Sequence, residues 1–483
     1  MNIQLSDHFS YKKLLRFTLP SIAMMVFTSI YGVVDGLFVS NFVGKTPFAA
    51  VNIVWPYIMM LGCVGFLFGT GGSALIAKKL GERKNQEANR LFSLFVYASM
   101  ILGVVILIAG QLLLRPVARL QGAEGQLLDD CIRYGRVVLL GIPAYILQLE
   151  FQSLMITAEK PQLGLYITIG SGVLNMIGDA LFTAILPWGL EGAALATVLG
   201  QIAGGIVPLV YFFCKNNSLL RLTRCRFDGR ALLHCCINGS SELMSNISMN
   251  LVGMLYNLQL MRYIGENGVA AYGVLMYVSF IFISIFIGYA IGTAPLFGFH
   301  YGAQNGGELR SLLKKSFVIM GITSVCMVVL SIVLARPLAK IFVGYDQELC
   351  DLTYRAFILN AFSLLFVGIA IFSSSFFTAL SNGLISALIA FLRTLVFQIA
   401  AVLLLPLVWG VDGIWISVAV AELAACILGC VFIAAKRNKY GYYNKPRGDF
   451  PRGSFYRYYR GSKSAAPCLH RGQMMSSGSS LPS

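Results

Sequence analysis

Charged residues and histidines are scarce in this chain, and each shortage argues against a class of protein. Only 12% of the 483 residues are Asp, Glu, Lys or Arg, whereas 57% are hydrophobic. Soluble domains contain about 25% charged and roughly 45–50% apolar residues, so a soluble fold is excluded and lipid is the predicted solvent. The only histidines are His8, His234, His300 and His470, too few to favour a histidine-based metal enzyme.

Metal-type cysteine motifs and a cleavable leader are also missing. None of the eleven cysteines forms a CxxC pair, so the spacing of common zinc sites is absent. We expect the cysteines to pack as small hydrophobic side chains. The first apolar segment contains Pro20 and continues for a full membrane span, which predicts a retained helix rather than a signal peptide.

Long apolar stretches recur along the chain at about the length that a helix needs to cross a bilayer, roughly 20 residues. A β-barrel would show short alternating segments, whereas the run from Ala98 to Leu114 is continuously apolar. The pattern predicts an all-α integral membrane protein with twelve transmembrane helices. The predicted spans are 17–40, 48–77, 91–114, 135–158, 162–186, 190–214, 236–261, 269–299, 313–335, 353–380, 383–407 and 411–435.

The two halves of the chain repeat each other at a fixed step. Arg115 recurs as Arg336 and Trp188 as Trp409, and 336−115 and 409−188 both equal 221. Six helices per half is an even number, so the repeats run parallel about an axis along the membrane normal. We predict an N-terminal lobe at 1–214, an inter-lobe loop at 215–234, a C-terminal lobe at 235–437 and a basic disordered tail at 438–483.

Lysine and arginine collect on alternate loops, which predicts the orientation. Basic residues precede the first helix, follow the second, separate the halves and precede the ninth, whereas the opposite loops mix both signs or are short. Both termini are therefore expected in the cytoplasm. The formal charge of +16 is spread over several loops rather than one stripe, so inner-leaflet lipid explains it better than nucleic acid.

Four polar residues in the first half have mainly apolar counterparts in the second. Asp35, Asn175, Asp179 and Thr197 become Tyr256, Val396, Ala400 and Val418 at the step of 221. Helical rise brings the four to similar depths, and Asn175 and Asp179 share a face. Their oxygens suit Na⁺ or a proton, because two carboxylates in one low-dielectric pocket resist ionising together. The alternative is that both acids only cap or hydrogen-bond backbone near the interface.

Three further acids are secondary candidates for a site in the cavity: Glu150, Glu242 and Glu422. Glu150 and Glu422 lie within spans, where an ionisable group needs a reason, although either could be a structural residue bonded to a neighbouring helix. Glu242 is expected at the start of its helix, where the dipole favours an acid. Arg393 is expected to extend toward the cytoplasm as a bystander.

These residues resemble the multidrug and toxic compound extrusion family, within it the bacterial multidrug efflux pumps. The resemblance covers about residues 10–435 and is carried by the segments 14–25, 38–44, 49–56, 71–84, 189–201 and 291–305. It implies two lobes around a central cavity that opens alternately to each side of the bacterial inner membrane. It also implies efflux driven by Na⁺ or H⁺, with the coupling ion on Asp35, Asn175, Asp179 and Thr197. Some relatives use acids in helices 7 and 10, but this chain has none within helix 10.

The preferred function is therefore export of organic, cationic compounds by antiport, with no cofactor beyond the coupling ion. The expected partners are small organic substrates and membrane lipid, with no nucleic acid and no obligate protein partner. The alternatives are a flippase for a lipid-linked saccharide, which would need a strongly cationic cavity, and an exporter of a metabolite. An enzyme is disfavoured, because Asp129 and Asp130 lack the second acidic pair of a metal-diphosphate site.

Overall fold

The computed structural model describes residues 3–38, 45–186, 188–344 and 346–442, except for the side chains at 33–38, 45, 46, 48 and 250. Residues 1–443 form one compact unit. The first half contains α1 (Tyr11–Phe38), α2 (Lys45–Gly62), α3 (Val64–Gly81), α4 (Asn85–Leu120), α5 (Gly125–Leu140), α6 (Ile142–Thr157), α7 (Pro161–Asp179), the π-helix η2 (Ala180–Ile185) and α8 (Gly189–Phe213). The second half contains α9 (Gly229–Tyr263), α10 (Glu266–Gly302), α11 (Gly306–Val343), α12 (Gln347–Ala361), α13 (Leu364–Ala379), α14 (Gly383–Phe391), the π-helix η3 (Leu392–Phe397) and α15 (Gln398–Ala435).

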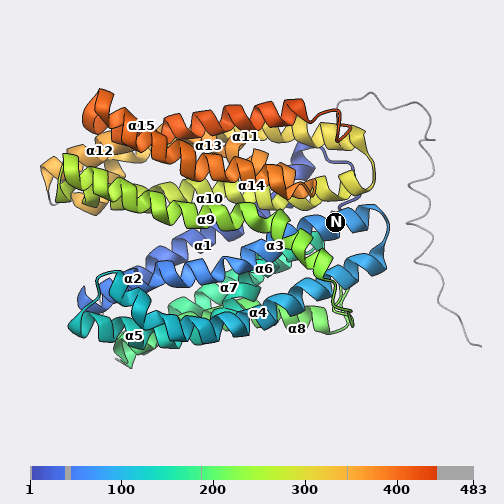
Figure 1. Cartoon of the computed structure of the whole chain (residues 1–483), viewed down its shortest axis with the longest axis horizontal. Coiled ribbons are helices and arrows are strands. Elements are labelled where there is room, and N and C mark those ends of the chain that lie inside the picture. Colours follow the sequence, from blue (N-terminus) through green and yellow to red (C-terminus); the bar gives the residue numbers. More distant parts are fainter. Residues whose placement is uncertain (1–2, 39–44, 187, 345, 443–483) are drawn as a thin grey trace, which may run out of the picture. The chain divides into compact units, whose positions relative to one another are not determined.

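These elements account for the twelve predicted spans. Eight stretches are long and apolar enough to cross a membrane, and the bent pairs α5–α6 and α12–α13 raise the number to ten. Two more follow because α15 turns at Gly410, whose φ of +57° suits glycine, and because α9 is a 35-residue helix of lower hydropathy. The prediction of a twelve-helix, all-α membrane protein is confirmed, and Figure 1 shows the helices running in broadly the same direction.

The repeat is visible in the helix boundaries. α4 starts at Asn85 and α11 at Gly306, and 306−85 equals 221. The break between α5 and α6 lies at Gly141, and the same step leads to Phe362, where α12 gives way to α13. These bends of 56° and 49° were not expected, because the apolar pattern runs through both of them.

The two halves meet along a tight seam. α3 lies against α9 so closely that a Cβ built on Gly239 would be 2.1 Å from the carbonyl oxygen of Leu67. α3 also meets α10, where a Cβ on Gly302 would be 2.0 Å from the carbonyl oxygen of Lys78. Glycine permits such backbone approach between membrane helices. This part of the bundle, where α1, α4 and α11 begin, is called the closed end below.

Toward the opposite ends of the same helices, the described glycines make no such close backbone approach. α1 touches α10 near Gly288, where an added Cβ would lie 2.6 Å from the Cα of Ile22. Further from the closed end, glycines of α1, α9 and α10 have nothing within 4 Å of an added Cβ in the described part of the chain: Gly32, Gly253 and Gly273. The close backbone contacts between the halves therefore lie at the closed end; the other end is called the open end below.

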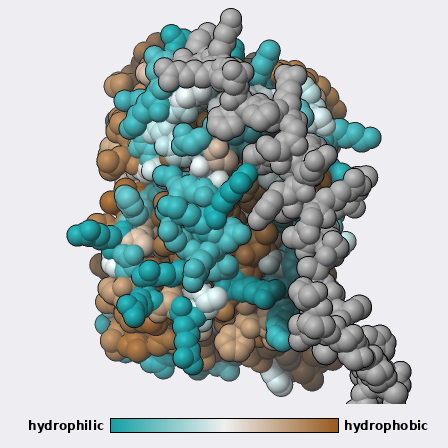
Figure 2. Space-filling view, turned by 90° about the vertical axis from the view of Figure 1, so that its right-hand side faces the viewer, coloured by the Kyte–Doolittle hydropathy of each residue, from teal (hydrophilic) through white to brown (hydrophobic). Residues whose placement is uncertain are grey.

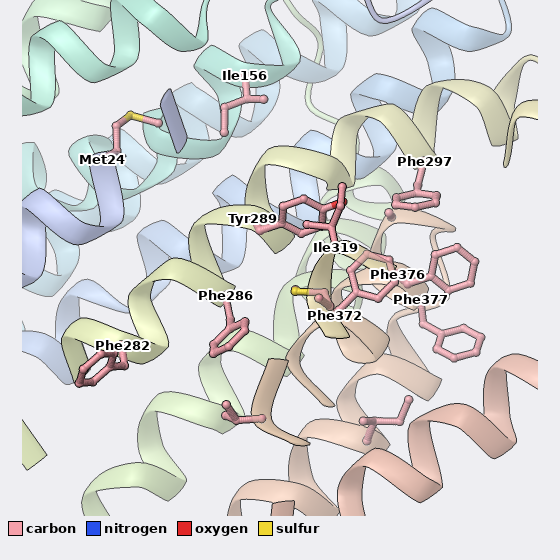
Figure 3. Packing of buried hydrophobic residues seen from close by; sticks show 14 of the residues in the cluster. Met24, Ile156, Phe282, Phe286, Tyr289, Phe297, Ile319, Phe372, Phe376 and Phe377 are labelled. Atoms are coloured by element: carbon pink, nitrogen blue, oxygen red, sulfur yellow. The ribbon is translucent and has the colours of Figure 1, made fainter. Parts of the chain in front are cut away.

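Aromatic side chains fill the second half near the closed end. The ring of Phe297 on α10 meets Phe372 and Phe376 of α13 edge-on, with centroids 5.7 and 5.1 Å apart (Figure 3). Such edge-to-face contacts stabilise beyond the area that they bury. The outer faces of the helices instead expose apolar residues such as Leu112 and Ile341. Figure 2, which faces the closed end, shows hydrophilic residues over its middle.

The predicted tail starts too early. Tyr440 and Tyr442 are buried, and the hydroxyl of Tyr442 donates to the carbonyl oxygen of Ile433. The ring of Tyr440 packs edge-on against Phe377. Residues 438–442 thus belong to the packed bundle, and the rest of the predicted tail lies outside the described residues.

Candidate functional site

Three of the four predicted site residues lie together between α7 and α8. Asn175, Asp179 and Thr197 are all buried. A Cβ on Gly178 would lie 2.9 Å from the Cβ of Ala196, so the two helices touch directly beside Thr197. Asn175 and Asp179 are separated by one helical turn and flank this contact from one side. The small residues of α8 make the approach possible, because no bulky side chain keeps α7 away.

The oxygens of this cluster include atoms suited to hold a cation. The hydroxyl of Thr197 donates to the carbonyl oxygen of Ala193 in its own helix (3.1 Å), so its lone pairs remain available. The side-chain oxygen of Asn175 has no hydrogen-bond partner within the described part of the chain. A buried amide oxygen without a partner is costly, and a bound cation or proton carrier would satisfy it. Asp179 adds a fully buried carboxyl group.

The helix widens directly after Asp179. The π-helix η2 begins at Ala180, and the hydroxyl of Thr183 donates to the carbonyl oxygen of Asp179. Single π-turns inside α-helices occur frequently at functional sites. The sequence predicts a continuous α-helix here. η2 shows that the helix changes from α to π winding directly after Asp179, one of the residues predicted to hold the ion.

Asp35 lies on α1, which packs beside α7 in the same direction. Gly164 faces Met24, and further along both helices Gly172 faces Phe27 and Tyr31. Position 35 is about 6 Å beyond Tyr31 at 1.5 Å per residue, between the levels of Asn175 and Asp179, which are about 4.5 and 10.5 Å beyond Gly172. The backbone register therefore agrees with the predicted cluster. The side chain of Asp35 lies outside the described residues.

A chain of hydrogen-bonded polar residues, which the sequence analysis did not single out, adjoins the cluster. Gln148 of α6 donates to the hydroxyl of Ser171 (3.4 Å), which donates to the carbonyl oxygen of Gly200 (2.8 Å). Gln201 is buried nearby, and its side-chain oxygen has no partner within the described residues. Ser171 lies one turn before Asn175 and Gln201 one turn after Thr197, so a search for polar residues at four-residue spacing would have found both.

A small cavity lies beside this chain, between α6, α7 and α8. Gln148, Gln152 and Thr168 are among its lining residues, and its volume is about 10 Å³. That volume is close to the minimum for one water molecule. The cavity therefore has room for about one water molecule beside Gln148, about two helical turns from Asn175, and not for a drug-sized compound.

Glu150 faces away from this region. Gln148, two residues earlier, contacts α7 and α8, whereas the carboxylate of Glu150 accepts from the hydroxyl of Ser99 on α4. Its other oxygen has no partner within the described residues, and the side chain is fully buried. Glu150 is therefore bonded to a neighbouring helix and is not brought into the cluster.

The second half contains a neutral network at the equivalent place. Tyr256, the counterpart of Asp35, donates to the side-chain oxygen of Gln398 (3.0 Å) and shares a hydrogen bond with Ser417 (2.6 Å). Its ring stacks on Tyr272 with centroids 5.3 Å apart. The hydroxyls and the amide satisfy one another, so this network presents no carboxylate to a cation.

Two expectations about the second half are wrong. Arg393 does not extend away as a bystander, because its Nε donates to both carboxylate oxygens of Glu422, at 3.1 and 2.8 Å. Both side chains are largely buried, with exposed fractions of 13% and 5%. Glu422 is therefore the partner of a buried guanidinium and not an uncommitted acid.

Glu242 is the second correction. It lies 13 residues after Gly229, where α9 begins, so it is not at the start of its helix. The expectation failed because a polar stretch at 236–246 resembles a helix start, although the helix runs through it. Glu242 is within electrostatic range of Arg393 and of Cys63. It is not brought near Asn175, Asp179 and Thr197.

Comparison with known proteins agrees with this architecture. Multidrug export protein MepA of Staphylococcus saprophyticus is 24% identical over 437 residues, which cover 89% of this chain and 94% of that protein. MepA of Staphylococcus aureus is 23% identical over 425 residues, covering 88% and 93%. An outward-facing structure of a multidrug resistance MATE family transporter of the MOP superfamily has a TM-score of 0.85 at 23% identity, covering 91% of this chain and 98% of that one.

The family model named MatE matches the chain twice, at residues 20–181 and 243–404, once in each half. Together these matches span more than half of the 483 residues. One match falls in each of the two repeats that the fold shows. The chain belongs to the MatE family, the multidrug and toxic compound extrusion family that its motifs resemble.

Proposed function

We propose that this protein is a secondary active efflux transporter that exports organic, cationic compounds in exchange for Na⁺ or H⁺. The cluster of Asn175, Asp179 and Thr197, completed by Asp35 of α1, binds the coupling ion. The single observation that carries this proposal is the buried side-chain oxygen of Asn175, which has no hydrogen-bond partner among the described residues and lies beside the carboxyl of Asp179. The names of the MepA relatives support the export of drugs.

Coupling requires that the ion bind one conformation better than another. In the present conformation the close backbone contacts between the halves lie at the closed end. α1, α7 and α8 all contribute to the cluster, so a change in its occupancy bears on the packing of α1, which also contacts α10 of the second half. An ion arriving from the open end would thereby favour release of substrate.

The closed end is proposed to face the cytoplasm. Basic residues dominate its loops, among them Lys78, Arg83, Lys84 and Arg310, whereas the open end mixes acidic and basic residues. Positive charge is retained on the cytoplasmic side. This orientation places both termini in the cytoplasm and makes the present conformation outward-facing.

The flippase alternative receives less support. A cavity for lipid-linked pyrophosphate would need uncommitted positive charge, yet Arg393, which lies within a second-half span, is paired with Glu422. The pairing leaves no free guanidinium at that position. An exporter of an organic metabolite would use the same fold and stays open to the experiment below.

Efflux of a fluorescent lipophilic cation from proteoliposomes tests the proposal, with Na⁺ and proton gradients imposed separately. Asp35→Asn and Asp179→Asn are each expected to abolish gradient-driven efflux. Asp129→Asn makes the same chemical change on an exposed residue of α5 and is expected to leave efflux unchanged. Native-like efflux in both site variants would overturn the assignment of the site. Absence of efflux from the native protein would favour a metabolite or lipid substrate.

A further inference from the structure

The segment before α1 crosses from the first half to the second. Residues 3–10, here called the strap, lead into α1 at the closed end. Leu5 and Phe9 are fully buried, and the ring of Phe9 meets Phe17 of α1 edge-on, with centroids 5.9 Å apart. The strap is thus packed into the bundle and does not hang into solvent.

The far side of the strap is fastened to α11 of the second half. The amide of Phe9 donates to one carboxylate oxygen of Glu308 (3.0 Å), and Nδ1 of His8 lies 2.6 Å from the other. Nζ of Lys315 donates to the carbonyl oxygen of Phe9. Three bonds between charged groups of α11 and two consecutive strap residues therefore join the halves.

The near side of the strap is fastened to the first half. The amide of Leu5 donates to a carboxylate oxygen of Glu159, between α6 and α7 (2.6 Å). Asp7 accepts from the amide of Gln4 (2.9 Å) and pairs with Lys13 of α1 (2.8 Å). The strap is consequently anchored within its own half and reaches α11 as a bridge.

The segment before α9 makes the reciprocal crossing. Residues 214–228, here called the link, lead into the second half but bond to α4 of the first. The amide of Arg221 donates to Asn89 (2.7 Å), and that of Thr223 donates to Ser93 (2.8 Å). α4 and α11 are repeat partners, so each half sends its leading segment to the same helix of the other.

Glu308 and its repeat partner bond to different segments. Its counterpart at the step of 221 is Glu87, which pairs with Lys79 at 2.9 Å within the first half. The counterpart of Lys79 is His300, which is buried and whose ring nitrogens have no hydrogen-bond partner within the described residues. The carboxylate of Glu308 instead bonds to the strap. The α11 helix does not need this carboxylate as a cap, because Asn305 caps it.

We propose that the strap is a latch that holds the closed end shut, with Glu308 as the residue to which it fastens. The inference rests on the proposed function in one respect, since alternating access requires the halves to separate at this end. The link is covalent and remains attached to both halves, whereas the strap can be released by breaking its bonds to Glu308 and Lys315. Release would allow α3 to move away from α9 and α10.

Hydrogen–deuterium exchange of the full chain in lipid nanodiscs, without substrate or ion gradient, tests the latch. Glu308→Ala is expected to raise exchange in residues 3–10 and in the seam at 67–81 and 235–241 roughly tenfold, because loss of charge-assisted bonds raises the population of the open state. Exchange at 264–275, at the open end, should not change. Glu87→Ala, the matched control at the repeat position, removes an ion pair within the first half and should leave exchange at 3–10 and 235–241 unchanged.

A second variant keeps the test decisive if Glu308→Ala does not fold. Lys315→Leu introduces the residue found at the repeat position, Leu94, and removes the bond to Phe9. It should raise exchange in the same segments by a smaller factor. Unchanged exchange at the seam in a folded variant would overturn the latch. Because no transport is measured, this outcome is independent of whether the protein exports organic cations.

Discussion

The two halves of the bundle have one architecture and opposite polarity at its centre. The first half buries Asn175 and Asp179 where α7 meets α8, and the second half has Val396 and Ala400 there. One turn away the second half is the more polar one, because its Arg393 and Glu422 correspond to Gly172 and Gln201 of the first half. The second half thus satisfies its buried charge internally. The comparison teaches that a duplicated scaffold can keep buried oxygens available in one half, where we propose that the ion binds, while the buried charges of the other half pair with each other.

The largest expected effect comes from breaking the internal ion pair. Arg393→Leu leaves Glu422 buried without its partner, which should destabilise the protein by about 3–5 kcal/mol. Adding Glu422→Gln, the first-half residue, should recover most of the loss, because neither buried charge remains. The midpoint of thermal unfolding in detergent measures both. A single variant as stable as the native protein would show that the pair does not neutralise the second half.

The next largest effect is expected from loosening the packing between α7 and α8 in the first half. A Cβ on Gly200 would lie 3.0 Å from the Cβ of Asn175, so Gly200→Ala should push the helices apart at a cost of about 1–3 kcal/mol. We expect a lower apparent affinity for the coupling ion in the efflux assay. The repeat position is already Ala421, and Ala421→Gly should not alter that affinity. Equal affinities for Gly200→Ala and the native protein would contradict the packed site.

Removing one hydroxyl from the second-half network should have a smaller effect. Tyr256→Phe loses its bonds to Gln398 and Ser417 and should cost about 1–2 kcal/mol of stability. Ion-driven efflux should persist if, as proposed, the coupling ion binds in the first half. Thermal unfolding and proteoliposome efflux measured on the same preparation check the two parts. Loss of ion coupling in a stable Tyr256→Phe protein would place part of the ion pathway in the second half.

The smallest expected effect is a pH dependence in how firmly the strap docks, which the link should lack. Burial raises the pKa of Glu159 to about 7 from its usual 4.5; the amide of Leu5 and Lys160 oppose the rise and Asp7 adds to it. If releasing the strap exposes Glu159, the docked state binds the proton more tightly, so docking strengthens as pH falls through 7 and levels off near 4.5.

Exchange of residues 3–10, corrected for its intrinsic pH dependence, should therefore be slower at pH 5.5 than at pH 8. Glu159→Gln should remove this difference. The link bonds to α4 through Asn89 and Ser93, which do not titrate in this range, and should show no such dependence. A stronger strap at high pH would reverse the inferred sign.

Much of the fold could be predicted because lipid imposes a simple pattern. Each span needs about 20 apolar residues, so their number, order and duplication are visible along the chain. The bends at Gly141 and Phe362 and the π-turn after Asp179 could not be predicted, because they depend on contacts between helices and not on hydropathy. Polar residues can also mislead: those at 236–246 hid the fact that α9 begins at Gly229.

The grouping of the candidate residues could be predicted to a similar extent, whereas their role as a coupling site stays a prediction. Comparison of the halves selected Asn175, Asp179 and Thr197, and the structure places these three together. Pairing was harder to foresee, because Arg393 and Glu422 are 29 residues apart and meet only after the chain turns at Gly410. The bond of Glu308 to the strap spans 299 residues and leaves no local pattern at all. Charges are visible in a sequence, but their partners depend on the fold.

The central claim is that ion coupling resides in the first half alone. The most direct test gives three of the four first-half site residues their second-half counterparts: Asn175→Val, Asp179→Ala and Thr197→Val. The variant is reconstituted in proteoliposomes with an imposed Na⁺ or proton gradient. The account predicts that this inserted, folded protein no longer shows gradient-driven efflux of an organic cation. Efflux that still follows the imposed gradient would contradict it.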